Sequence, residues 1–165
     1  MTASTPHEAA RQVAKALGGS EHFVVELLAE DDWSFVIKAH ALAEAAVARA
    51  IIKSIGQAKV EAFLDDLSMS RRLDLADSLS TISPECIGRA RQLSKLRNLV
   101  AHDISQVGFT FKEYFKDENK RNAFFGVFLD GVTGTIEFGG KPIERKQFYR
   151  DNPKWAVSEF LFNLL

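Results

Sequence analysis

Two histidines, an arginine and a carboxylate are the side chains of this sequence best suited to acid–base chemistry on an anionic substrate. Arg97, Asn98 and His102 fall within six residues, and His40 and Glu44 are four residues apart. A histidine exchanges a proton near neutral pH, and an arginine stabilises charge on a phosphate. If these side chains converge, they suit metal-free cleavage of a phosphodiester. A histidine would take the proton of a ribose 2′-hydroxyl, the arginine would stabilise the phosphorane, and a second acid would protonate the leaving oxygen.

His40 is placed by the longest predicted helix, which runs from Trp33 to about Ile55. Asp32 is the expected N-cap, and Gly56 is expected to end the helix. Apolar residues recur at three- and four-residue steps along one stripe, and this stripe includes His40. Its members include Val36, Ala39, Ala43, Val47, Ala50 and Ile51. Seven alanines between residues 39 and 50 indicate that a neighbouring helix approaches closely.

Arg97 and His102 belong to a second predicted helix, which opens at Ser83-Pro84-Glu85 and ends near His102-Asp103. A hydroxyl N-cap, a proline at the first helical position and an early acid are typical of a helix start. Five residues on an ideal helix correspond to a rotation of about 140°. Arg97 and His102 therefore meet only if the helix ends between them, or if the arginine side chain curls toward the helix end.

Structural interpretations of the same residues stay open. His102 at a helix end is suited to capping and ion pairing, and Asn98 to bridging backbone groups. His40 and Glu44 also suit a satisfied buried pair. A metal site made of His40, Glu44 and His102 has plausible ligand types but only three ligands. We therefore predict no metal and no cofactor.

Local charge favours an anionic partner, although the whole chain has a net charge of −1. Four cations lie between Pro84 and His102 against one acid, Glu85, and a second basic patch surrounds a predicted hairpin. Basic patches of this kind bind phosphates in a salt-dependent way, although a solvated helix face has the same composition. The first patch consists of Arg89, Arg91, Lys95 and Arg97, of which the first three are candidate nucleic-acid contacts; the second consists of Lys141, Arg145, Lys146 and Arg150.

Composition limits the class of protein. The chain has 165 residues, 46% of them hydrophobic, which suits one domain with its own core. Its single cysteine excludes a disulfide framework. No apolar run approaches the roughly 20 residues of a membrane span, and residues 1–8 lack a signal pattern. We expect a soluble cytoplasmic protein. Neither a nucleophile elbow nor an HExxH motif is present, and the glycines near Lys141 have the wrong spacing for a phosphate loop.

The remaining pattern predicts one all-α domain over residues 1–165, a helical bundle with four to five core helices and a short β-hairpin insertion at 131–147. An N-terminal helix or arm occupies residues 1–18 and ends at Gly18-Gly19, and Ser20 caps a second short helix. A break is expected in the polar run from Lys116 to Asn122. Further helices are predicted over 58–67 and 70–82, from Thr110 onward, and from Asn152-Pro153 to the end.

The sequence Arg97-Asn98-x-x-x-His102 resembles the R-x4–6-H signature of the HEPN superfamily. The order of elements agrees: a long helix with Ile37-Lys38-Ala39-His40-Ala41-Leu42-Ala43-Glu44, then Arg72 to Ala76, then Leu93 to His102. This layout is most similar to the mannitol operon repressor branch and covers roughly residues 20–130.

The resemblance implies a helical bundle, often a homodimer, in which two such motifs surround one RNA-cutting cleft. In that setting Arg97 would bind the scissile phosphate, Asn98 would orient it and His102 would be the general acid or base. We therefore expect a metal-independent endoribonuclease, in a toxin–antitoxin or defence context, with RNA and an antitoxin or regulatory protein as partners. The alternatives are a non-catalytic transcriptional regulator or protein-interaction module of the same superfamily, and a small-molecule sensor using the His40/Glu44 cleft.

Overall fold

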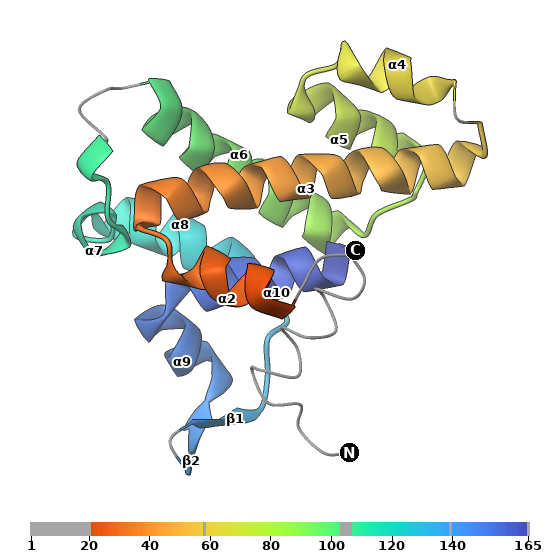
Figure 1. Ribbon diagram of the computed structural model, residues 1–165. Helices are drawn as coiled ribbons and strands as arrows, with labels where there is room; N and C mark the ends of the chain where they lie inside the picture. Colours follow the sequence, from red (N-terminus) through yellow and green to blue (C-terminus); the bar gives the residue numbers. More distant parts are fainter. Residues whose placement is uncertain (1–20, 58, 103–106, 139, 165) are drawn as a thin grey trace.

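The computed structural model describes residues 21–57, 59–102, 107–138 and 140–164 of the chain. Within these ranges the chain forms nine helices and a two-stranded antiparallel hairpin (Figure 1). The predicted fold class, all-α with a hairpin near the C-terminus, is therefore confirmed. The helix expected in the N-terminal arm, its double-glycine end and the Ser20 cap lie outside the described residues.

The long helix α3 spans Asp32–Ile55 and follows the short helix α2, Glu21–Ala29. Its N-cap is Asp31, not Asp32 as predicted: the Asp31 carboxylate accepts a hydrogen bond from the Ser34 N–H at 2.9 Å. At the other end Gly56 adopts φ +72°, and its N–H donates to the carbonyl of Ile52 at 2.9 Å. The predicted glycine end of this helix is confirmed.

Helices α4 (Val60–Asp65) and α5 (Met69–Ser78) are both shorter than the predicted helices 58–67 and 70–82. Ser80, with φ +51°, lies where the second prediction still continued as helix, and a left-handed residue interrupts the helical hydrogen bonds. Helix α6 spans Pro84–His102, as predicted, and the Ser83 hydroxyl accepts from the Cys86 N–H at 3.3 Å.

The aromatic-rich stretch forms α7 (Phe111–Tyr114) and α8 (Glu118–Phe128). Thr110 caps α7 by accepting from the Glu113 N–H at 3.2 Å, as its spacing predicted. The break expected within the polar run from Lys116 to Asn122 is confirmed at the start of that run, because α7 ends at Tyr114 and α8 begins at Glu118. Asp117 accepts hydrogen bonds from the N–H groups of Asn119 and Lys120, and this cap starts α8 within the polar run.

The hairpin pairs β1 (Thr135–Phe138) with β2 (Lys141–Glu144), with Ile136 opposite Ile143. The expected insertion at 131–147 is too long at its C-terminal end, because helix α9 (Arg145–Asp151) starts immediately after β2. A side-chain tie fixes α9: the Arg145 guanidinium donates to the Tyr149 hydroxyl at 3.1 Å and to the Glu159 carboxylate at 2.8 Å. Glu159 belongs to the last helix, α10 (Pro153–Leu164).

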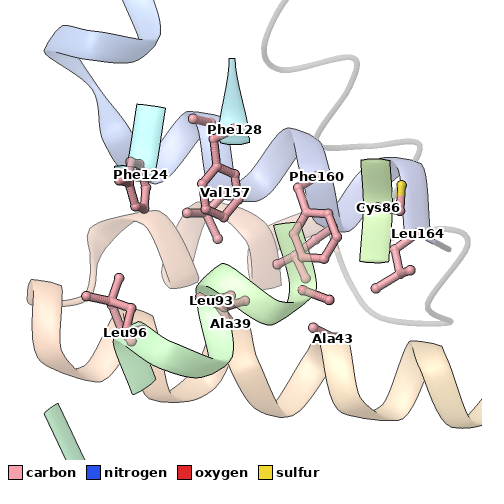
Figure 2. Close-up of a cluster of buried hydrophobic side chains, with 14 of the residues drawn as sticks. Ala39, Ala43, Cys86, Leu93, Leu96, Phe124, Phe128, Val157, Phe160 and Leu164 are labelled. Carbon is pink, nitrogen blue, oxygen red and sulfur yellow. The ribbon is translucent and has the colours of Figure 1, made fainter. Parts of the chain in front are cut away.

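The core is formed where α3, α6, α8 and α10 meet (Figures 1 and 2). Ala39 and Ala43 are completely buried, and Figure 2 shows Leu93 and Leu96 of α6 close to this face of α3. The Trp33 indole N–H donates to the carbonyl of Val100 at 2.9 Å and joins the start of α3 to the end of α6. The close helix approach predicted from the alanines is confirmed, and it fixes how α3 and α6 present their polar residues.

Candidate functional site

A cavity of about 470 Å³ opens to solvent between α3, α5 and α6, and we call it the α3–α6 cleft. His40 and Glu44 line it from α3, while Arg97 and Asn98 line it from α6. Two of the predicted basic residues, Arg91 and Lys95, also lie in its wall, together with Ser94. The cleft thus brings together the predicted site residues of α3 and those of α6, with the exception of His102.

His40 is almost entirely buried, with 7% of its surface exposed. Its Nε2 lies 3.2 Å from the Ser94 hydroxyl, and that hydroxyl donates its own hydrogen to the carbonyl of Ala90 at 2.9 Å. Ser94 therefore accepts from His40, which assigns the hydrogen to Nε2 and leaves the lone pair on Nδ1. The hydrogen-bond partner of the imidazole is Ser94 and not Glu44, which the sequence had suggested.

The electrostatic surroundings keep this imidazole neutral at pH 7. Burial lowers the pKa of His40 below its usual value, the negative charge of Glu44 opposes that shift, and the positive charge of Arg97 adds to it. A neutral imidazole with a lone pair is able to accept a proton. His40 is therefore in the protonation state that a general base requires.

Glu44 is held by Arg72, a residue of α5 whose guanidinium is buried beside the cleft. The Arg72 Nη1 lies 3.5 Å from a Glu44 carboxylate oxygen, and its Nε donates to the carbonyl of Leu67 at 3.0 Å. The Glu44 side chain is 34% exposed, so it faces both this arginine and solvent. A buried arginine tied to the backbone fixes where the carboxylate sits.

The α6 side of the cleft carries positive charge. The Arg97 guanidinium donates to the Asn98 side-chain oxygen at 3.2 Å, and Lys95 is exposed. Arg91 is paired with Asp74 at 2.8 Å, which offsets part of its charge. Arg97 and Lys95 therefore leave the mouth of the cleft suited to a phosphate or another anion.

His102 is exposed at the last position of α6 and is not among the described residues that line the cleft. Helix α6 continues unbroken from Arg97 to His102, so the rotation of about 140° between them holds. Within one chain the two residues of the signature are not brought together.

Arg89, the remaining candidate nucleic-acid contact, lies outside the cleft and serves the fold. Its guanidinium donates to the carbonyls of Val127 at 3.4 Å and Asp130 at 2.7 Å, near the C-terminal end of α8. These carbonyls have no helical partner further along the chain, so a cation with several donors is well suited to them.

Sequence reasoning missed Ser94 and the role of Arg72. Ser94 is 54 residues from His40, and only the packing of α3 on α6 brings the two together. Arg72 stands in the segment Arg72–Ala76 that carried part of the resemblance, but no spacing linked it to Glu44. Each of them contacts a predicted site residue of another helix, and a sequence contains no direct signal for contacts between helices.

Neither a metal site nor a membrane-spanning helix is found in the described part of the chain. It contains no group of three His, Cys, Asp or Glu side chains placed to hold a metal ion. His40, Glu44 and His102 thus do not form the three-ligand site that the sequence left open. None of the described helices is both long enough and apolar enough to cross a membrane.

Comparison with known proteins adds no relative. Neither protein-family models, nor curated proteins, nor solved structures give a match to this chain.

Proposed function

We propose that the chain is a HEPN-like, metal-independent endoribonuclease acting at the α3–α6 cleft. The observation that carries the proposal is a neutral, buried imidazole sharing a solvent-open cleft with an arginine: His40 and Arg97. The resemblance of Arg97-Asn98-x-x-x-His102 to the signature of the HEPN superfamily supports the same RNA-cleaving chemistry. Such a nuclease fits a toxin–antitoxin or defence setting, in which a partner protein restrains it.

The reaction follows from the atoms present in the cleft. His40 Nδ1 takes the proton of a ribose 2′-hydroxyl, and the oxygen attacks the adjacent phosphorus. Arg97 stabilises the charge that develops on the phosphorane, and Asn98 orients the phosphate. The bond from phosphorus to the 5′-oxygen breaks, and an acid protonates that oxygen. The products are a 2′,3′-cyclic phosphate and a free 5′-hydroxyl.

The acid in this proposal is His102 from a second copy of the chain. Within one chain His102 is outside the cleft, at the exposed end of α6. A symmetric homodimer that joins the two α6 ends would place the partner's His102 near the Arg97 of the other copy. Closed two-fold dimers are the commonest oligomers, so this arrangement needs no unusual symmetry.

Incubation of the purified protein with total RNA in EDTA tests the proposal directly. We expect cleavage products with 2′,3′-cyclic phosphate ends, and a rate lowered about 10²- to 10⁴-fold in each of His40→Asn, Arg97→Ala and His102→Ala. Arg49→Ala is the matched control, because Arg49 is an exposed cation of α3 outside the cleft. Failure of the wild type to cleave RNA overturns the proposal. Unchanged cleavage in His102→Ala removes the partner's histidine from the mechanism.

The position of His102 favours a second candidate, a non-catalytic HEPN-like regulator or interaction module. Without an acid in the cleft, Arg97 and Lys95 would bind RNA phosphates and leave them uncut. We then expect salt-dependent retention of RNA in a gel-shift assay, weakened by Arg97→Ala, with no new RNA ends. Cleavage products in EDTA that disappear in Arg97→Ala would exclude this candidate.

A further inference from the structure

A larger cavity, of about 780 Å³, lies between α8 and α9 and shares no lining residue with the α3–α6 cleft. Its polar wall holds the cations Arg121, Lys146 and Arg150, with Asp130 as its one carboxylate among the described residues. Its apolar wall includes the rings of Phe115 and Phe125. The second basic patch of the sequence thus contributes two cations to this wall.

These cations are only weakly neutralised by their neighbours. Arg121 lies 3.4 Å from the Glu118 carboxylate, but both side chains are about half or more exposed, so solvent screens the pair. Within the described residues, Lys146 and Arg150 form no ion pair at 4.0 Å or less. Their charges are therefore free to act on a ligand.

An adjoining cavity of about 550 Å³ shares Phe115 and Arg150 with the first. Its walls include the half-buried ring of Trp155. Its Asp32 and Lys154 pair with each other at 3.0 Å, so they contribute little net charge. We call these two adjoining cavities together the α8–α9 groove; its cationic part and its aromatic part share the side chains of Phe115 and Arg150.

The aromatic part is held in place before any ligand arrives. The Phe115 ring stacks on Phe111 at 5.6 Å between centroids and packs against Phe125 at 4.8 Å. Phe111 is in turn fixed at its backbone, because its N–H donates to the Asp32 carboxylate at 2.8 Å. A rigid ring loses little conformational freedom when a flat ligand stacks on it.

We propose that the α8–α9 groove binds a nucleoside monophosphate. Its phosphate is held by Arg121, Lys146 and Arg150, and its base lies against the rings of Phe115 and Trp155. Arginine forks and a lysine ammonium match phosphate oxygens, and aromatic side chains accept the flat face of any base. This site is separate from the α3–α6 cleft and does not depend on the function proposed for it.

Calorimetric titration of the full chain with AMP, GMP, CMP and UMP tests the proposal, with inorganic phosphate and adenosine as partial ligands. We expect at least one nucleotide to bind more tightly than either partial ligand. Arg150→Ala and Lys146→Ala should each weaken binding about tenfold, the effect of one charge-assisted hydrogen bond. Binding should quench or shift the tryptophan fluorescence. This change should persist in the Trp33→Phe variant, because it reports the base next to Trp155.

The matched controls are Arg49→Ala, which removes an exposed cation of α3 outside both the α3–α6 cleft and the α8–α9 groove, and Lys141→Ala, which removes an exposed cation of the hairpin. Both should bind the nucleotide as the wild type does. The proposal is overturned if none of the four nucleotides binds at millimolar concentration, or if phosphate alone binds as tightly as the best nucleotide. Equal binding by Arg150→Ala, Lys146→Ala and the wild type would also overturn it, because the phosphate contacts would then lie elsewhere.

Discussion

At the scale of single residues, the sequence identified His40, Glu44, Arg97 and Asn98 as chemically suited, and the structure brings all four into one cleft. Helical spacing predicts which face of its own helix each side chain occupies, but it does not predict that α3 and α6 bring these faces together. The partner of His40 was not predictable, since Ser94 is reached only across the contact of α3 with α6. The candidate site residues could therefore be predicted from the sequence, whereas the contacts between residues of different helices could not.

The burial of His40 predicts a specific loss of stability in acid. Because burial lowers its pKa, the unfolded chain holds a proton on His40 between the ordinary value of 6.5 and the lowered value, and the folded chain does not. The free energy of unfolding contributed by this residue is complete above pH 6.5 and falls as pH drops through that window. Urea unfolding at pH 7.5 and 5.5 should therefore show a larger decrease for the wild type than for His40→Gln.

The comparison with His40→Gln cancels the titration of the carboxylates common to both proteins. The charges that face His40, Glu44 and Arg97, are retained in the variant. An identical decrease in the free energy of unfolding in both proteins would contradict a buried neutral imidazole.

At the scale of elements, caps were predicted well and their details depended on tertiary contacts. Asp31 and Asp32 are equally good N-caps by type, and the Asp32 carboxylate is instead used by the Phe111 N–H and by Lys154. Helix α9 was missed for a related reason. Its seven residues bury only Phe148 and Tyr149, too few for a periodic pattern, and its order comes from the tie between Arg145 and Glu159.

The glycine end of α3 makes a quantitative prediction. Gly56 has φ +72°, where a Cβ is unfavourable whatever the space around it. Gly56→Ala should therefore lower the free energy of unfolding by about 1 kcal/mol, measured by urea denaturation. Gly56→Asn is the matched control and should cost less, because asparagine tolerates the left-handed region. Equal loss in both variants would assign the effect to the side chain rather than to the backbone.

The end of α8 depends on a cation from another helix. Removing the Arg89 guanidinium leaves the carbonyls of Val127 and Asp130 without their donor. Arg89→Ala should lower the free energy of unfolding by about 1–2 kcal/mol. Lys95→Ala, an exposed residue on the same helix, should change it by less than about 0.5 kcal/mol. Thermal unfolding of the two variants side by side is the measurement, and similar melting temperatures would refute the capping role.

At the scale of the whole molecule, the fold class followed from periodicity, whereas the arrangement of helices around the cleft did not. Six large apolar residues are exposed among the described ones, spread from α2 to β1, and two of them, Leu99 (38% exposed) and Val107 (63% exposed), lie on either side of the end of α6 in the sequence. A dimer that joins these ends would cover them, as the proposed nuclease requires.

We expect the wild-type protein to sediment as a dimer at tens of micromolar, and Leu99→Glu to sediment as a monomer. Phe63→Glu is the control: Phe63 is 59% exposed but lies on α4, away from the end of α6, so this variant should remain dimeric. A wild-type monomer under these conditions would count against the symmetric dimer and its shared active site.

One ammonium group connects segments of the chain that are made at very different times. Lys154 of α10 donates to the carbonyls of Leu28, at 3.4 Å, and Glu30, pairs with Asp32 and lies 5.5 Å from the centre of the Phe35 ring. The contacts of Lys154 with the corner between α2 and α3 therefore form only after a residue more than 120 positions later has been synthesised. In a nascent chain that still lacks α10, the corner between α2 and α3 would lack its lysine, and α3 would lack its contact with α10. Folding of this protein is thus completed only after α10 has left the exit tunnel.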